Sequence, residues 1–159
     1  MHDMRGRCYE SASRYVLDTA NAGDESARYV QGTIIRLADG RIIDHAWAEH
    51  GDAVIDRTIS DDPIDKTEYY SATHAHPRLR ADANDIAFAR VIVGKHGPYT
   101  DDDIARARAR IREMDARVQQ RQNFTAQMRA RAARIHAKDR ERRRKNLIAR
   151  ALYAIGIDL

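Results

Sequence analysis

Residues 41–59 read RIIDHAWAEHGDAVIDRTI, and the architecture of the chain follows from this stretch. On both sides of Gly51-Asp52, apolar and β-branched residues alternate with polar ones, which is the pattern of two antiparallel strands joined by a two-residue turn. We therefore expect strands over 41–49 and 53–59.

The expected turn also fixes which side chains share a face of the hairpin. With two residues in the turn, Trp47 faces Asp56 and His45 faces Thr58, all on one surface. His45 and Asp56 are then diagonal neighbours within the reach of a carboxylate–imidazole hydrogen bond. A register shift of one residue would move Asp56 to the opposite face.

Upstream of this hairpin, the sequence predicts a helix over residues 6–20 and a strand over 29–37. Asn21-Ala22-Gly23 ends the helix, and Asp39-Gly40 is a two-residue hairpin signal between the strands. The helix pattern comes from residues at helical spacing, namely Cys8, Ala12, Tyr15, Val16 and Thr19. The first 60 residues thus predict a helix followed by an antiparallel meander, with Cys8 in the first turn of the helix.

The segment 60–98 gives weaker signals. Thr67 to Thr73 fits a strand or a loop, and Ala87 to Val93 favours a strand over a short helix. We assign residues 1–98 to one α+β module.

Residues 99–159 predict a basic helical extension. Thr100 is the expected N-cap, the acidic residues 101–103 suit the positive end of the helix dipole, and no glycine or proline follows until Gly156. Apolar residues at spacings of three and four predict one long helix, or two, with a narrow seam for packing against the module or a second copy: Ile104, Ala107, Ile111, Met114, Val118, Met128, Ala132 and Ile135.

Composition supports this two-part division. Of the 159 residues 43% are apolar and 33% are charged, and the net charge is +4. Residues 1–100 carry 12 basic and 16 acidic side chains, whereas residues 101–159 carry 16 and 8. The sequence shows neither a secretion leader nor an apolar run of membrane-spanning length, so we expect a cytoplasmic protein without a membrane partner.

Cys8 is the only cysteine, which excludes an internal disulfide and a multi-cysteine metal site. A thiol at a helix N-terminus beside an imidazole is an effective nucleophile, because both favour the thiolate. Cys8, His45 and Asp56 are therefore the candidate catalytic residues, as nucleophile, base and orienting carboxylate. The Cys8 backbone N–H is the expected oxyanion donor, with His2 or a nearby backbone group as the second.

Two short runs in the same stretch resemble a known signature. Residues 45–49 (HAWAE) and 54–58 (VIDRT) are similar to the HAWVE…(V/W)xDPT signature of transglutaminase-like proteins. That resemblance implies a papain-like fold, in which a helix-borne Cys precedes a strand-borne His and an Asp. The run Cys8-Tyr9-Glu10-Ser11 also resembles small bacterial and phage-encoded relatives, which implies a virion-associated location if the chain is phage-encoded.

The sequence departs from this family at two points. Arg57 replaces the usual proline, and the spacing from Cys8 to His45 is short, so we expect a minimal substrate cleft. Residues 5–10 (RGRCYE) also resemble the R-G-G-x-C-x-E run of arylamine N-acetyltransferases, a much longer family that the remainder of the chain does not match.

A metal site is not expected. His74 and His76 with Asp82 lack a further ligand at a compelling spacing, and loop histidines are the simpler interpretation. No cofactor is predicted either.

The basic stretch of the extension has three interpretations: a solvated helix face, a nucleic-acid site and a site for an acidic protein partner. Arginines bind phosphates bidentately and release counterions, so a basic helix can hold nucleic acid without sequence specificity. The candidate binding residues are Arg140, Arg142, Arg143, Arg144 and Lys145.

The sequence thus predicts a cysteine hydrolase or acyl transferase that acts on a peptide or another acyl substrate through a Cys8 thioester. The alternative is a non-catalytic interaction or phage assembly protein that uses its basic helix.

Overall fold

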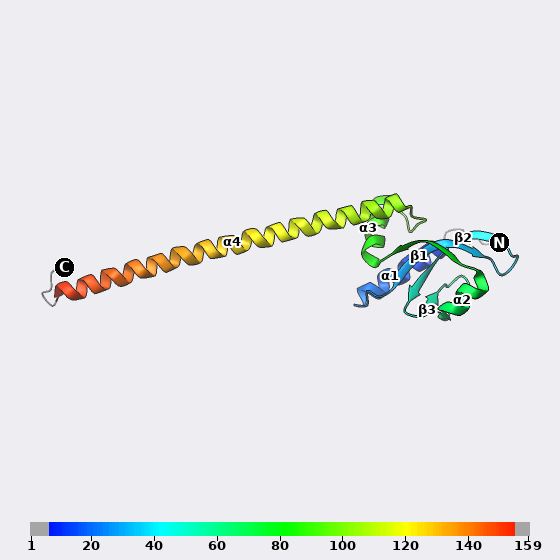
Figure 1. The fold of residues 1–159 in the computed structure, drawn as a ribbon, viewed down its shortest axis with the longest axis horizontal. Helices are drawn as coiled ribbons and strands as arrows, with labels where there is room; N and C mark the ends of the chain where they lie inside the picture. Colours follow the sequence, from blue (N-terminus) through cyan, green and yellow to red (C-terminus); the bar gives the residue numbers. More distant parts are fainter. Residues whose placement is uncertain (1–6, 155–159) are drawn as a thin grey trace. The chain divides into compact units, whose positions relative to one another are not determined.

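The computed structural model describes the backbone of residues 7–154 and the side chains of residues 7–148. The chain divides into two compact units between Arg112 and Glu113. Within the first unit, described from residue 7, helices and an antiparallel sheet form an α+β fold (Figure 1). The described part of the second unit is helical throughout.

The sheet has five strands in the order β4-β3-β2-β1-β5, and every neighbouring pair is antiparallel. The expected meander therefore lies at its centre, and a strand from later in the chain completes one edge. The strands are β1 (Arg28–Ile35), β2 (Ile42–His50), β3 (Ala53–Ile55), β4 (Ile64–Asp65) and β5 (His76–Ala81).

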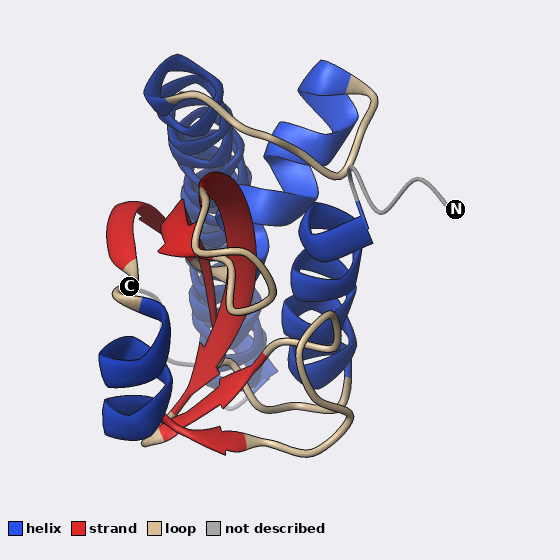
Figure 2. Ribbon diagram, turned by 90° about the vertical axis from the view of Figure 1, so that its right-hand side faces the viewer, coloured by secondary structure: helices blue, strands red, loops and turns tan. Residues whose placement is uncertain are grey.

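Four helices lie in the described part of the chain: α1 (Arg7–Asn21), α2 (Lys66–Thr73), α3 (Ala83–Val93) and α4 (Asp101–Ala154). The sheet lies between α2 on one side and α1 with α3 on the other (Figure 2). Alternate residues of β2 serve the two layers, because Ala46 and Ala48 pack in the core with α1 and α3 whereas Trp47 packs with Tyr69 of α2.

The register at Gly51-Asp52 is as predicted. Ala48 pairs with Ile55 and His50 with Ala53 across the two-residue turn. The second strand is shorter than expected, because β3 ends at Ile55 and the chain turns away at Asp56. Consequently β3 does not extend alongside His45, and Asp56 approaches His45 from a turn.

The turn between β1 and β2 is wider than predicted. Ile35 pairs with Ile42, and the Arg36 N–H donates to the carbonyl of Arg41 over 2.8 Å, so four residues form the turn instead of Asp39-Gly40 alone. The observed pairing of β1 with β2 is displaced from the predicted register by an even number of residues. Every β2 side chain therefore keeps its expected face.

The strand-or-loop prediction for Thr67 to Thr73 is wrong, because this segment is α2. The Asp65 carboxylate caps the helix by accepting the Glu68 N–H over 3.0 Å. The strand preference over Ala87 to Val93 is also wrong. Asp82 caps α3 through the Asp85 N–H, and Gly94 ends it in the left-handed conformation.

The strand β5 follows from neither propensity nor alternation, since it contains Pro77. Pro77 lies at a bulge on the sheet edge, where the β1–β5 register shifts between Gln31 and Gly32. At this bulge the two backbones approach closely: a Cβ on Gly32 would lie 2.1 Å from the carbonyl oxygen of His76. Only glycine fits there.

α4 begins as predicted and continues as a single helix of 54 residues. The Thr100 hydroxyl accepts the Asp103 N–H, and the Asp103 carboxylate accepts the Thr100 N–H over 2.9 Å. In the first unit Ile104 and Ala107 join the core. From residue 113 to 148 the apolar side chains are exposed. No described helix combines the length and apolar character needed to cross a membrane.

Candidate active site

Cys8 lies in the first turn of α1 with only 7% of its surface exposed. The α1 helix places Cys8 against β2, where the backbone N–H groups of Ala46 and Tyr9 hydrogen bond to the sulfur. Its thiol also hydrogen bonds to the side chain of His45. Cys8 and His45, 37 positions apart in the sequence, thus meet as predicted.

His45 is held by its strand and by its ring neighbours. On β2 it pairs with Gly32 of β1, and its ring stacks on Trp47 with 6.4 Å between centroids. His45 Nε2 donates to Asp56 Oδ2 over 2.7 Å. Because Asp56 engages Nε2, the other ring nitrogen, Nδ1, remains for the thiol.

Asp56 lies directly after β3 and is buried. Besides His45, it accepts the Thr58 hydroxyl at 2.6 Å and the Thr58 N–H at 3.1 Å, both on Oδ1. The Tyr69 hydroxyl of α2 donates to Oδ2 over 2.9 Å. The Thr58 hydroxyl also lies 3.4 Å from His45 Nε2. Four hydrogen bonds therefore fix the carboxylate that orients the imidazole.

These contacts set the charges of the three groups. Burial raises the pKa of the Cys8 thiol, but the hydrogen bond and charge of His45 outweigh it, so the net shift is downward. Burial lowers the pKa of His45, but Asp56 and Cys8 raise it to about 9 overall. Burial likewise raises the pKa of Asp56, and His45, Thr58 and Tyr69 together lower it below its usual value. The arrangement favours a thiolate beside an imidazolium.

Two further groups of the site are absent from the sequence-based prediction. Tyr69 lies in a segment whose pattern fits a strand or loop, and Glu49 has no special role by sequence. Glu49 is buried and accepts from Lys66 at 2.6 Å, Tyr70 at 2.5 Å and Arg80 at 3.0 Å. Burial alone would raise the pKa of Glu49, but these partners lower it to about 2. This cluster connects β2, α2 and β5 on the Trp47 side of the sheet.

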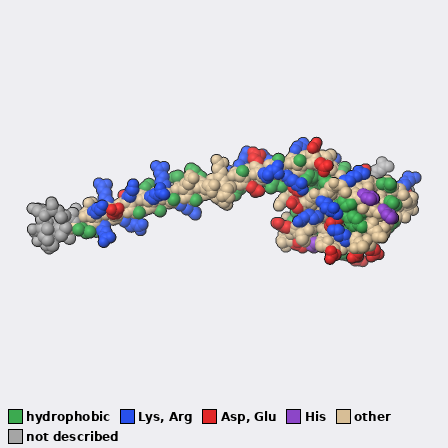
Figure 3. Space-filling model, in the orientation of Figure 1, with side chains coloured by type: hydrophobic (Ala, Val, Ile, Leu, Met, Phe, Trp, Pro, Cys, Tyr) green, Lys and Arg blue, Asp and Glu red, His purple; other side chains and the backbone are tan. Residues whose placement is uncertain are grey.

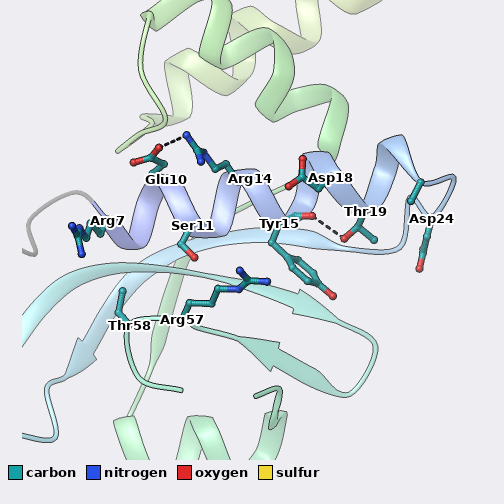
Figure 4. Close-up of a pocket in the computed structure, with 11 residues that line it drawn as sticks. Arg7, Glu10, Ser11, Arg14, Tyr15, Asp18, Thr19, Asp24, Arg57 and Thr58 are labelled. Carbon is teal, nitrogen blue, oxygen red and sulfur yellow. Dashed lines mark hydrogen bonds and ion pairs between the residues drawn. The ribbon is translucent and has the colours of Figure 1, made fainter. Parts of the chain in front are cut away.

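An open cleft of about 930 Å³ runs along α1, and its lining includes Arg7, Arg57 and Thr58, which are neighbours in sequence of the three residues or in contact with them (Figure 4). Residues of α1, among them Arg7, Ser11 and Tyr15, form one wall, and Arg57 with Thr58 forms the facing wall. Thr58 links the cleft to the buried pair, because its hydroxyl contacts both Asp56 and His45. His2, one of the candidates for the second oxyanion donor, lies outside the described residues.

The candidate binding residues of the extension lie on α4, in the second unit. They are Arg140, Arg142, Arg143, Arg144 and Lys145. The side chains of all five are exposed, and basic groups line the helix (Figure 3). Lys145 forms an ion pair with Glu141 over 2.9 Å.

Among the residues that the structure describes, no group of three or more His, Cys, Asp or Glu side chains is arranged to hold a metal ion. Comparisons of this chain with protein-family models, with curated proteins and with solved structures found no match.

Proposed function

We propose that residues 1–98 form a cysteine hydrolase or acyl transferase of the transglutaminase-like kind, with a papain-like core. The observation that carries this proposal is the hydrogen-bonded series Cys8–His45–Asp56, in which a helix N-terminus, a strand and a turn each supply one group. The order of the three residues along the chain is also the order that the family resemblance implies.

The reaction would proceed in two stages. The Cys8 thiolate attacks the acyl carbon of an amide or ester and forms a C–S bond, and the His45 imidazolium donates its proton to the departing amine or alcohol. Water, or an acceptor amine, then loses a proton to His45 and attacks the thioester, which releases Cys8. Hydrolysis and transfer differ only in the second nucleophile.

The oxyanion of each tetrahedral intermediate needs hydrogen-bond donors. We assign the Cys8 N–H, at the positive end of α1, as one donor. Asp56 would hold the imidazole in the orientation that serves both stages, and Tyr69 and Thr58 would hold Asp56.

Alkylation of the single thiol tests this proposal. We expect iodoacetamide to modify Cys8 at pH 7 at least about tenfold faster than it modifies 2-mercaptoethanol, because the folded site favours the thiolate. His45→Gln should lower the alkylation rate and move its midpoint to higher pH, because burial then raises the pKa of Cys8 without an opposing imidazolium.

Acyl transfer to the thiol is the second measurement. With p-nitrophenyl acetate we expect a burst of one nitrophenol per chain and an acetyl adduct on Cys8 in the mass spectrum. Cys8→Ala should give neither. If Cys8 is alkylated no faster than 2-mercaptoethanol and never carries an acyl group, the proposed enzymatic function is excluded.

A second function belongs to the extension. We propose that Arg140, Arg142, Arg143 and Arg144 bind nucleic acid through its phosphates, because these guanidinium groups are exposed on one helix of the second unit. A salt titration of DNA binding by the full chain tests this function, because affinity that depends on phosphate contacts falls as salt is added.

A further inference from the structure

The cleft along α1, which is lined by Arg7 and linked to the buried His45–Asp56 pair through Thr58, carries an unequal distribution of charge along its length. In Figure 4, Arg7 and Thr58 lie toward one end of the cleft, and Asp24 lies at the other. The first end is the one next to the buried His45–Asp56 pair, because Thr58 contacts both of these residues.

Other charged side chains of the cleft already have partners. Arg14 forms an ion pair with Glu10 over 2.7 Å, and the Asp24 carboxylate hydrogen bonds to the His50 ring over 2.8 Å. Within the described part of the chain, Arg7 and Arg57 have no hydrogen-bond or ion-pair partner. The cleft therefore holds two uncompensated guanidinium groups, Arg7 at the end nearer Thr58 and Arg57 extending from beside Thr58 toward the middle of α1 (Figure 4).

Both arginines adjoin the proposed catalytic residues in sequence. Arg7 directly precedes Cys8, and Arg57 directly follows Asp56, from which its side chain extends into the cleft facing α1 (Figure 4). The bonds that fix Asp56 also fix the backbone that carries Arg57, because the Asp56 carbonyl accepts the N–H groups of Ile59 and Ser60 at 3.0 Å each. Arg57 is thus presented to the cleft from a rigid turn.

We propose that this cleft selects acyl substrates that carry a carboxylate close to the scissile carbonyl, and that Arg57, with Arg7, binds this carboxylate. The proposal rests on the function proposed above and adds its substrate class. A guanidinium is always charged and offers two parallel N–H donors, which match the two oxygens of a carboxylate. The acidic side chains at the far end, Asp18 and Asp24, would repel the same group and so fix the direction in which the substrate lies.

Two alkylating reagents of nearly equal size test the inference on the intact chain. Iodoacetate carries a carboxylate next to its reactive carbon, whereas iodoacetamide is neutral there. For each reagent the Cys8 thiolate displaces iodide, and the ratio of the two rate constants is compared with the ratio for 2-mercaptoethanol. At low ionic strength we expect the protein's ratio to exceed that of 2-mercaptoethanol by about fivefold or more, and to fall as salt is added.

Substitutions then assign the effect to a residue. Arg57→Gln should lower the iodoacetate-to-iodoacetamide ratio by about threefold or more, and Arg57→Lys should retain part of it, because the charge remains but the paired donors are removed. Arg41→Gln is the matched control, since Arg41 is exposed in the β1–β2 turn and outside the cleft, and it should keep the wild-type ratio.

A wild-type ratio equal to that of 2-mercaptoethanol, or a ratio unchanged by Arg57→Gln, would overturn the inference. Failure of the proposed function would look different. In that case the neutral reagent iodoacetamide alone would react with Cys8 no faster than with 2-mercaptoethanol at neutral pH, whereas the ratio of the two reagents reports the charge of the cleft at any absolute rate.

Discussion

The four hydrogen bonds that reach the Asp56 carboxylate come from His45, Thr58 and Tyr69, and only one of them is part of the proposed chemistry. The others hold a charged group inside the protein, where an unpaired carboxylate would be costly. The Tyr69 hydroxyl is the only one of these donors that comes from α2, so it ties the helix to the site.

Tyr69→Phe removes this hydroxyl and keeps the ring among Trp47 and Tyr70. We expect the free energy of unfolding at pH 7 to fall by about 1–2 kcal/mol, because the hydrogen bond is to a charged acceptor. The pKa of Asp56 is lowered in the folded protein, so its contribution to stability is present above about pH 4 and is lost as the pH falls through the folded value. The difference between variant and wild type, measured by urea denaturation, should therefore shrink at acidic pH.

Tyr99→Phe is the control for this experiment. The Tyr99 hydroxyl donates to the backbone carbonyl of Lys95 over 3.0 Å, and this acceptor does not titrate. Its stability difference should persist at acidic pH. A Tyr69→Phe difference that persists equally would mean that the hydroxyl does not act through Asp56.

Strand alternation predicts that His45 and Asp56 share a face, and the helix position of Cys8 together with the family resemblance predicts that Cys8 joins them. His45 and Asp56 depend only on the register of a two-residue turn, and Cys8 depends on one helix. Tyr69 could not be predicted in the same way. Its contact with Asp56 requires α2 to pack on the Trp47 face of the sheet, and adjacent tyrosines favour a strand by propensity.

At the scale of the elements, we expect the bulge between β1 and β5 to position His45, because the bulge falls at the β1 residue that pairs with it. Gly32 is the β1 partner of His45, and on the other side of β1 it faces the backbone of His76 and Pro77 in β5. The edge strand β5 thus comes close to β1 at the residue that pairs with His45. Only a residue without a Cβ permits this close approach.

Gly32→Ala should destabilise the first unit by about 2–3 kcal/mol or more, because a Cβ at 2.1 Å from a carbonyl oxygen forces backbone to move. The displacement of β1 should also slow the alkylation of Cys8 through His45. Denaturant unfolding and the iodoacetamide rate measure the two effects.

Gly40→Ala serves as the comparison. Gly40 has a φ of 68° in an exposed turn, and an added Cβ would meet nothing within 4 Å. It should cost about 1 kcal/mol through backbone strain alone and leave the alkylation rate unchanged. Equal effects from both substitutions would show that the bulge does not position His45.

The elements that the sequence predicts best are those with strong local signals, such as the hairpin at Gly51-Asp52 and the cap at Thr100. α2 and α3 are not predicted, although their caps, Asp65 and Asp82, are visible in the sequence. In α3 the β-branched residues Val91, Ile92 and Val93 favour a strand, yet Val91 is 82% exposed. The capping of the helix and the packing of Ile86 and Ala89 in the core outweigh the strand propensity of these β-branched residues.

For the whole molecule, the two units carry different chemistry. The proposed thiol site and its cleft belong to the first unit, and the second unit is an exposed helix with many arginines and an apolar seam that includes Met114, Val118 and Met128. The division of charge along the sequence anticipates this division of structure, but a basic helix alone does not identify its partner.

Joint replacement of Arg142, Arg143 and Arg144 by Gln should weaken binding of the full chain to double-stranded DNA. If each arginine binds a phosphate, the slope of log affinity against log salt concentration should become shallower by about 0.9 for each phosphate that is no longer bound. Fluorescence anisotropy between low and physiological salt measures the slope. Arg41→Gln should leave it unchanged, and absence of binding at low salt would exclude nucleic acid as the partner.

The meeting of Cys8 with His45 has a thermodynamic consequence for folding as a whole. The pKa of His45 is raised to about 9, so its stabilisation is complete below about pH 6.5 and is lost as the pH rises through about 9. The pKa of Cys8 is lowered, so its stabilisation has the opposite sense and is lost as the pH falls. On folding, one group releases a proton while the other takes one up.

The proton that Cys8 releases on folding therefore offsets part of the proton uptake by His45 near neutrality. We expect the free energy of unfolding of the wild type to decline less steeply between about pH 6.5 and 8.5 than that of Cys8→Ala. Denaturation at a series of pH values measures both curves, and parallel curves would contradict the exchange. A chain built in this way can carry a charged imidazole in its interior with a smaller dependence of stability on pH than the imidazole alone would impose.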